Sequence, residues 1–148
     1  MDQTQKEFHI RGRILHNPKF FHPDGKASFK VCPVPAVRGN RENSFTLMTA
    51  RSEGQFNTVV FESDDRYRGV TSRNVVLISE DDLKKTGLKE GDTVIVNNKT
   101  GVMSGQKLQV YLIKPGNIMM YYPESNVLVP RQIDPKSKTP SFKSIEVF

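Results

Sequence analysis

The sequence contains no tryptophan, a single cysteine and only three histidines. The lone Cys32 can form neither a disulfide within the chain nor a cysteine-based metal site. No apolar run approaches the ~20 residues that a helix needs to cross a bilayer. The first six residues, Met1 to Lys6, also lack the apolar core of a signal peptide. We therefore expect a protein of the reducing cytoplasm with no membrane span.

Catalytic groups are equally scarce. His9, His16 and His22 are spaced so that they share no common face for a metal, and nothing places one of them beside Cys32 as a base. A small enzyme that uses Cys32 as its nucleophile is thus the weakest hypothesis. The acidic run 80–82 is typical of a helix N-terminus, and no Gly-rich phosphate loop of the Walker or Rossmann type is found. The sequence predicts no catalytic residue and no metal ligand.

Positive charge is what the chain has in excess. Its 148 residues, enough for one domain with a single core, carry 22 Lys and Arg against 16 Asp and Glu, for a net charge of +6. Much of the excess lies in residues 11–41 and 131–143. A basic surface suggests an anionic partner: a nucleic acid, a phosphorylated cofactor or an acidic protein. A free-standing basic β-barrel that binds nucleic acid or an acidic protein is therefore one candidate function, although no nucleic-acid-reading motif is present.

The pattern of apolar residues divides the chain in two. Residues 1–42 are irregular and rich in turn signals, as in an arm or linker, whereas residues 43–148 contain short β-branched runs separated by turns. Many short strands with one or two brief helices indicate an all-β fold closed into a barrel. The predicted strands are Phe45–Ala50, Val59–Phe61, Asn74–Ile78, Thr93–Val96, Lys107–Ile113 and Ile118–Tyr122, and the final residues 145–148 alternate like a further strand that returns to the barrel.

One helix is predicted over residues 79–87. Ser79 is a typical N-cap, three acids follow in the first turn, two lysines occupy the last turn, and Gly87 can end the helix. A Gly-Asp turn then leads into the strand at 93–96.

Three stretches carry side chains suited to a large polar ligand. The first, 49–58, lies between two apolar runs and combines the fixed donor fork of Arg51 with hydroxyls and amides. The second, 64–69, places Tyr67 between two arginines, where it could stack on a base. The third is Asn126 followed by residues 134–143, in which Lys alternates with Ser or Thr. Each has a simpler interpretation: a polar turn, a charged surface loop and a solvated tail, respectively.

Taken in order, these stretches resemble a known family. The carrying motifs are Thr-x-Arg-x(3)-Gln-x-Asn-Thr at 49–58, Asp-Leu-x(3)-Gly-Leu-x(2)-Gly-Asp-x-Val at 82–94, Asn126, and Asp-Pro-x-Ser-x-x-Pro-x-Phe-Lys at 134–143. The upstream segment 21–29 adds to the match. The order is similar to that of the C-terminal dinucleotide-binding domain of molybdopterin oxidoreductases, and most similar to formate-dehydrogenase-like alpha subunits.

The resemblance implies a six-stranded double-psi β-barrel that covers one side of a bis(molybdopterin guanine dinucleotide) cofactor carrying Mo or W. It implies that the catalytic and iron–sulfur domains of a parent subunit are partners, that nucleic acid is not, and that the chain is not catalytic alone. The cysteine cluster and metal-ligating residue of whole enzymes are absent, so the chain is read as a domain of a longer subunit or as a separate small subunit. The expected cofactor-binding residues are Thr49, Arg51, Ser52, Gln55, Asn57, Thr58, Tyr67, Asn126, Lys138, Phe142 and Lys143. We expect Arg51, Asn126 and Lys143 to converge at one mouth of the barrel.

Overall fold

A computed structural model describes residues 20–34, 44–56, 58 and 60–148. The chain divides into two units, Met1–Val37 and Arg38–Phe148. In the first unit, residues 21–26 form turns and bends around Asp24, whose carboxylate accepts hydrogen bonds from the Lys26 amide (3.0 Å) and the His22 ring (2.9 Å). His9, His16 and the expected boundary between 42 and 43 lie outside the described residues. No helix in the described part of the chain is long and apolar enough to span a bilayer.

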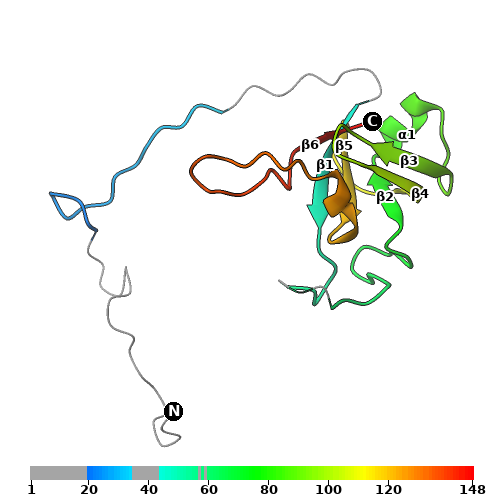
Figure 1. The fold of residues 1–148 in the computed structure, drawn as a ribbon, viewed down its shortest axis with the longest axis horizontal. Helices are drawn as coiled ribbons and strands as arrows, with labels where there is room; N and C mark the ends of the chain where they lie inside the picture. The colour runs from blue at the N-terminus through cyan, green and yellow to red at the C-terminus, as the bar shows by residue number, and fades with distance from the viewer. Residues whose placement is uncertain (1–19, 35–43, 57, 59) are drawn as a thin grey trace, which may run out of the picture. The chain divides into compact units, whose positions relative to one another are not determined.

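The second unit is built on six strands, which form one mixed sheet among the described residues (Figure 1). The strand order is β3-β4-β2-β5-β1-β6, with β1 parallel to β5 and β2 parallel to β4. The strands are β1 (Phe45–Ala50), β2 (Val75–Ile78), β3 (Thr93–Asn97), β4 (Val102–Val110), β5 (Asn117–Tyr121) and β6 (Ile145–Val147).

The sheet curls until its two edge strands meet at one end. Asn97, the last residue of β3, and Phe148, which follows β6, exchange backbone hydrogen bonds of 3.0 and 2.8 Å. Nearby, the Asn98 side chain donates to the Glu146 carbonyl oxygen at 3.3 Å. The expectation of an all-β fold is confirmed as a curled sheet with a single α-helix in the described part of the chain.

Five of the predicted strands and the returning C-terminal strand are confirmed, but two details are wrong. Residues 60 and 61 are not in a strand, and Val60 is 79% exposed, so this apolar run has no sheet to pack into. Strand β4 begins at Val102 instead of Lys107 and ends at Val110 instead of Ile113. Its first half carries mostly exposed side chains, which explains why hydrophobic pattern alone does not reveal it.

The predicted helix is confirmed as α1 (Glu80–Thr86). The Ser79 hydroxyl accepts from the Asp82 amide at 3.1 Å, and Gly87 closes the helix in the left-handed conformation, with φ of 70°. The Asp82 carboxylate in turn accepts from the Ser79 hydroxyl (2.8 Å) and from the Gly116 amide (2.7 Å). The cap therefore also ties the helix to the turn before β5.

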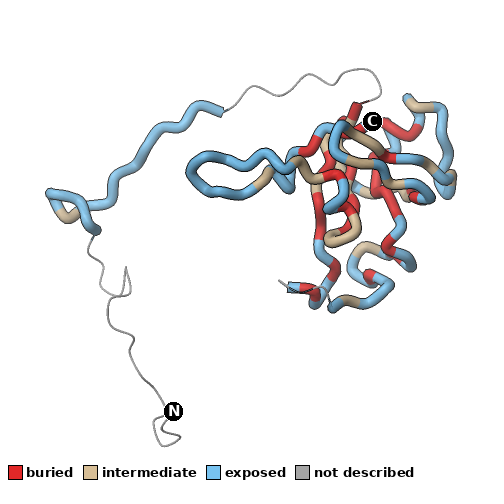
Figure 2. Tube along the Cα trace, in the orientation of Figure 1, coloured by how far each residue is buried: buried red, intermediate tan, exposed pale blue. Residues whose placement is uncertain are grey.

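Buried side chains lie on both faces of the central strands. In β2, Val76 and Ile78 join the main core, while Val75 and Leu77 join a smaller cluster that includes Val70 and Tyr121, as expected from the period-2 alternation of a strand. Figure 2 shows the buried residues concentrated along the strands, whereas the loop 131–144 is exposed almost throughout. The smaller cluster ends at Tyr121, where β5 gives way to the loops described next.

Candidate functional site

The candidate site lies where β1 and β5 end. These strands are parallel, with Ala50 paired to Tyr121, so the loops that follow them leave the sheet at the same end. The Tyr122 amide donates to the Ala50 carbonyl oxygen at 2.7 Å. Immediately beyond, the Arg51 guanidinium lies 5.5 Å from the centre of the Tyr122 ring. The first residue of each loop therefore contacts the first residue of the other.

The antiparallel strand β6 brings the C-terminal segment to the same place. Because Leu47 pairs with Ile145, residues just before β6 run beside the end of β1. The Thr49 amide donates to the Phe142 carbonyl oxygen at 3.1 Å, and the Lys143 ammonium donates to the Thr49 carbonyl oxygen. Thr49, Phe142 and Lys143 are thus brought together from opposite ends of the unit.

Three cations lie near one another at this point. Partial burial lowers the pKa of Lys143 below its usual value, and the nearby positive charges of Arg51 and Arg68 lower it further. Arg68 also donates to the Arg51 carbonyl oxygen at 3.1 Å. A lysine whose pKa is lowered by like charges sits in a positive potential that an anion would relieve. We call Arg51, Arg68 and Lys143 the cationic cluster.

The loop 64–69 is held to this cluster through Asp65. The buried Asp65 carboxylate accepts from Arg68 (2.6 Å), from the Tyr121 hydroxyl (2.8 Å) and from the Tyr67 amide (3.1 Å). Burial would raise the pKa of Asp65, but the hydrogen bonds from Arg68 and Tyr121 outweigh it, so the net shift is downward. Burial and the Asp65 carboxylate together raise the pKa of Tyr121. The Tyr67 ring remains 77% exposed beside Arg68, with one aromatic face available to a ligand.

Ser52 and Gln55 have their polar atoms engaged within the chain. Gln55 is fully buried, and its amide donates to the carbonyl oxygens of Tyr122 (2.8 Å) and Thr58 (3.3 Å). Its side-chain oxygen accepts from the Ser52 amide at 3.1 Å. The Thr58 hydroxyl donates to the Val60 carbonyl oxygen at 3.0 Å. These residues shape the loop, whereas Arg51 faces outward; Asn57 lies outside the described residues.

Arg73 is the residue of this region that the sequence does not reveal. It is buried just before β2, and its guanidinium donates to side chains and a carbonyl oxygen of both loops. In the sequence it stands in Ser-Arg-Asn, between a turn and a strand, and this local sequence is like that of any polar surface residue. Only the tertiary fold places it next to Ser52 and Glu124, so no local signal could have found it.

Asn126 and Phe142 line a common hollow of about 740 Å³. Asn126 belongs to the short 3-10 helix η1 (Glu124–Leu128), which follows β5 by way of Pro123. Phe142 lines this hollow, and the next residue, Lys143, contacts the Thr49 carbonyl oxygen at the end of β1. The structure brings Lys143 to the end of β1, and the convergence of Arg51, Asn126 and Lys143 on one ligand stays a prediction.

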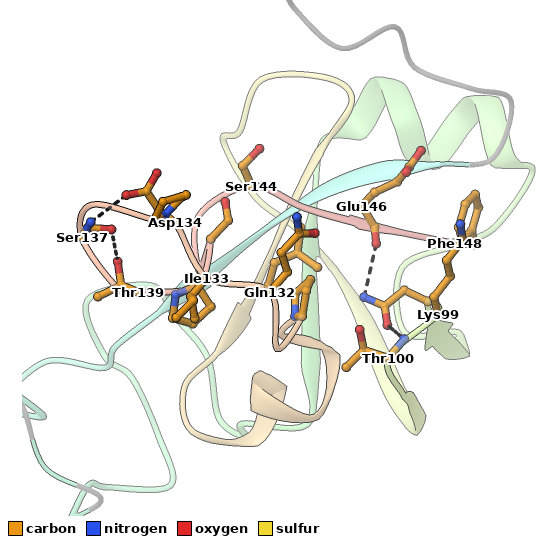
Figure 3. A pocket seen from close by; sticks show the side chains of 16 residues that line it. Lys99, Thr100, Gln132, Ile133, Asp134, Ser137, Thr139, Ser144, Glu146 and Phe148 are labelled. Carbon is orange, nitrogen blue, oxygen red and sulfur yellow. Dashed lines mark hydrogen bonds between the residues drawn. The ribbon is translucent and has the colours of Figure 1, made fainter.

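Lys138 lies apart from this arrangement, in the loop 134–139 that projects from the sheet (Figure 1). Its amide donates to the Asp134 carbonyl oxygen at 2.9 Å, and its φ of 57° marks a tight turn. Figure 3 shows a second hollow, of about 840 Å³, between this loop and the turn that carries Lys99 and Thr100. There, the Ser137 amide donates to the Asp134 carboxylate at 2.7 Å. The side chains lining this hollow are hydroxyls, amides and prolines more than charges.

No group of three or more His, Cys, Asp or Glu side chains in the described part of the chain could hold a metal ion. The described geometry is instead that of a polar, positively charged surface built from converging loops. Such a surface can bind an extended anionic ligand through charge, directed hydrogen bonds and one exposed ring.

Comparison with known proteins identifies the class. Residues 45–146 match the family model described as "Molydopterin dinucleotide binding domain". The chain therefore belongs to this family of molybdopterin dinucleotide-binding domains, and the resemblance found in the sequence is confirmed at that level.

The curated relatives are much longer than this chain. An uncharacterized oxidoreductase of Mycobacterium tuberculosis is 39% identical over 91% of this chain and 19% of its own length. The protein YdeP of Escherichia coli is 32% identical over 99% of this chain and 21% of its own length. The chain thus spans about a fifth of the length of the curated relatives it matches. Among solved structures, acetylene hydratase from Pelobacter acetylenicus is similar, with a TM-score of 0.49 and 16% identity over 70% of this chain and 18% of that chain.

Proposed function

We propose that this chain is the part of a formate-dehydrogenase-like molybdenum or tungsten oxidoreductase that holds a bis(molybdopterin guanine dinucleotide) cofactor. The family match supports a molybdopterin dinucleotide ligand, and the named relatives support an oxidoreductase context. The guanine form, the bis arrangement, the formate-dehydrogenase-like class and a cytoplasmic location are the finer parts of the proposal. A closed double-psi barrel belongs to the same proposal.

The observation that carries the proposal is the cationic cluster. Lys143 contacts the Thr49 carbonyl oxygen and Arg68 donates to the Arg51 carbonyl oxygen, and partial burial together with the charges of Arg51 and Arg68 lowers the pKa of Lys143. Asp65 pairs with Arg68 at 2.6 Å, whereas Arg51 is exposed and its guanidinium lies over the Tyr122 ring. The positive charge of Arg51 and Lys143 is therefore available to the phosphates of a dinucleotide. The donor set fits the cofactor's anionic centre.

Other residues have roles that follow from their positions. Asn126 and Phe142 line a common hollow, together with Lys99 and Arg131, and would contact the ligand there. The exposed ring of Tyr67 would provide a stacking surface. Ser52, Gln55 and Thr58 would act through the loop they shape, and Thr49 through its backbone contacts with Phe142 and Lys143. Asn57 and Lys138 remain proposed contacts on the sequence motif alone.

The cofactor supplies the redox chemistry at its metal when bound, whereas this chain's own residues bind and orient it. Catalytic and iron–sulfur domains of a longer protein are the proposed partners, consistent with the greater length of the relatives. Because those partners would form the rest of the binding cleft, we expect the 148-residue chain alone to bind weakly and to have no redox turnover.

The test uses guanosine diphosphate (GDP) as a probe for the nucleotide half of the cofactor. Titration of the full 148-residue chain, followed by NMR, should shift the amides of Arg51, Asn126 and Lys143. Replacement of Arg51 by Ala should weaken binding about tenfold, because a charge-assisted hydrogen bond contributes about 1.5–3 kcal/mol. The Lys84→Gln variant is the control, since Lys84 pairs with Glu80 on the exposed face of α1.

Two results would contradict the proposal. One is the same GDP affinity in the wild type and the Arg51→Ala variant. The other is tight binding to generic DNA that every Lys→Ala change weakens about equally, which would instead indicate a nucleic-acid-binding protein.

A further inference from the structure

The Arg73 guanidinium joins the two loops that follow β1 and β5. One of its terminal nitrogens donates to the Ser52 hydroxyl at 2.9 Å; the other donates to the Gln55 side-chain oxygen at 3.3 Å and to the Tyr122 carbonyl oxygen at 2.5 Å. Ser52 and Gln55 belong to the loop after β1, and Tyr122 begins the loop after β5. A single side chain therefore bridges both loops of the proposed cofactor site.

Glu124 pairs with Nε of Arg73 and with the terminal nitrogen that also reaches Gln55 and Tyr122. The distances are 2.6 Å from Nε to one carboxylate oxygen and 3.0 Å from a terminal nitrogen to the other, which is the bidentate geometry of strong arginine–carboxylate pairs. Burial would raise the pKa of Glu124, but the hydrogen bond from Arg73 outweighs it and lowers that pKa overall. The charge of Arg73 is thus balanced inside the protein.

Two aromatic rings fix the guanidinium plane. Its central carbon lies 3.7 Å from the centre of the Phe61 ring and 4.7 Å from the centre of the Tyr121 ring. Tyr121 in turn donates to Asp65, which holds Arg68 of the cationic cluster. The planar fork and stacking faces that this arrangement uses belong to arginine and not to lysine.

We infer that Arg73 is a positioning residue: it sets the loops 51–58 and 122–128 in register so that Arg51 and Asn126 face the same ligand. This inference rests on the proposed function for the identity of the ligand, but the coupling of the loops by Arg73 is independent of it. Arg73 contacts no ligand group itself, because its side chain is buried, each of its three nitrogens donates within the chain, and its charge is paired with Glu124.

Two variants distinguish a positioning role of Arg73 from a simple effect of its charge on GDP binding. Arg73→Gln removes a positive charge, whereas Glu124→Gln adds one to the net charge of the same region. If charge alone mattered, the first variant would bind GDP more weakly and the second more tightly. If positioning matters, both bind more weakly: Arg73→Gln about tenfold and Glu124→Gln about threefold, since the latter keeps the contacts of Arg73 to Ser52 and Tyr122.

Amide hydrogen exchange measures the coupling without any ligand. In Arg73→Gln, exchange at the Gln55 amide, which donates to Ser52, and at the Asn126 amide, which donates to Pro123, should accelerate together by about tenfold. The Leu83 amide in α1 should not change. Arg73→Lys should recover only part of the effect, because one ammonium cannot reach all the acceptors. Glu80→Gln and Lys84→Gln form the matched control, an exposed pair with a similar separation of 2.7 Å.

The outcomes are distinct. Faster exchange in both loops together with weaker GDP binding in both variants supports the inference. Opposite signs for the two variants, faster exchange in one loop only, or full rescue by Arg73→Lys would overturn it. If Arg73→Gln does not fold, Arg73→Lys and Glu124→Gln decide by the same criteria. If the wild type itself fails to bind GDP, the proposed function fails, and the exchange rates alone decide whether Arg73 joins the loops.

Discussion

The Lys143 ammonium donates a hydrogen bond to the carbonyl oxygen of Thr49, although the two residues lie 94 positions apart in the sequence. The contact follows from the antiparallel pairing of β6 with β1, which carries residues 142 and 143 past the end of β1. The ammonium is thereby held beside Arg51 and Arg68. Its position makes the protonation state of Lys143 the most direct probe of the site.

Anion binding should depend on pH through Lys143. Its folded-state pKa lies below the ordinary value of 10.5 because of partial burial and the charges of Arg51 and Arg68. A bound anion favours the charged ammonium, so GDP affinity should fall as pH rises through that lowered pKa, with proton uptake on binding at the same pH values. In the free protein, the stability of the fold depends on pH with the opposite sign. Because the folded-state pKa of Lys143 is lowered, this group's contribution to the free energy of unfolding increases as pH rises.

The measurement is the dissociation constant of GDP between neutral pH and pH 10. Lys143→Arg is the control, because arginine stays charged over this range while the titration of GDP itself affects both proteins equally. Identical pH profiles for the two proteins would show that Lys143 does not face the anion.

Asp65 should stabilise the fold in a pH-dependent manner. Its carboxylate holds Arg68 and Tyr121, and Asp65→Asn should lower the free energy of unfolding by about 2 kcal/mol at pH 7, the value of a charge-assisted hydrogen bond. Its folded pKa is lowered, so the contribution is fully present above the ordinary pKa of 3.8 and is lost as pH falls through the lower folded value.

Urea unfolding of the wild type and Asp65→Asn at pH 7 and in acid tests this expectation. Asp64→Asn serves as the control, because Asp64 lies 3.5 Å from an Arg66 side chain that is 92% exposed, and exposed pairs add little stability. A difference between wild type and Asp65→Asn that stays constant from pH 7 into strong acid would be inconsistent with a paired carboxylate.

Local signals in the sequence were enough for some elements and not for others. The α1 helix was predictable because Ser79, the acids after it and Gly87 are a complete set of capping signals within nine residues. The start of strand β4 was predicted at Lys107 instead of Val102, because the first residues of the strand are mostly exposed and do not alternate as a half-buried strand would. Residues 60 and 61 were predicted to belong to a strand because they are apolar. The prediction is wrong because an apolar run is buried as a strand only where it can pair with a sheet.

The same distinction applies to the site. Thr49, Phe142 and Lys143 could be proposed from residue type and motif order, and the fold brings them together. Arg73 could not, because its partners lie up to 51 positions away and meet it only in the folded chain. Gln55 was expected at the ligand by its chemistry, yet in the structure its amide is fully buried and bonded to Tyr122 and Thr58. Whether a polar residue faces a ligand or supports a loop is decided by tertiary contacts.

Gln106 presents an opportunity to increase stability. Its side-chain oxygen is buried in the sheet with no hydrogen-bond partner in the described structure, while its amide donates to the Ser104 carbonyl oxygen at 3.0 Å. Gln106→Met keeps the length of the side chain and removes the unsatisfied acceptor, so we expect a gain of about 1 kcal/mol and a higher melting temperature. Gln109→Met is the comparison, since the Gln109 amide reaches the Gly69 carbonyl oxygen at 3.3 Å and should lose stability. Destabilisation by Gln106→Met would mean that the oxygen has a partner, such as a buried water.

Gly101, in the turn between β3 and β4, packs closely against η1. A Cβ added there would lie 2.4 Å from the Val127 carbonyl oxygen and 2.8 Å from a Val127 methyl group. Because the first of these atoms is backbone, Gly101→Ala must displace η1 or the turn, at a cost of about 1–3 kcal/mol.

The displacement should also weaken GDP binding, since η1 carries Asn126. Gly105→Ala separates the two effects: a Cβ added at Gly105 meets no atom within 4 Å, but the residue has a φ of 71°, so alanine there is strained without touching η1. Thermal unfolding should show both variants destabilised, whereas GDP titration should show a loss of affinity only for Gly101→Ala. Equal GDP affinities in the two variants would separate η1 from the ligand site and remove Asn126 from the set of binding residues.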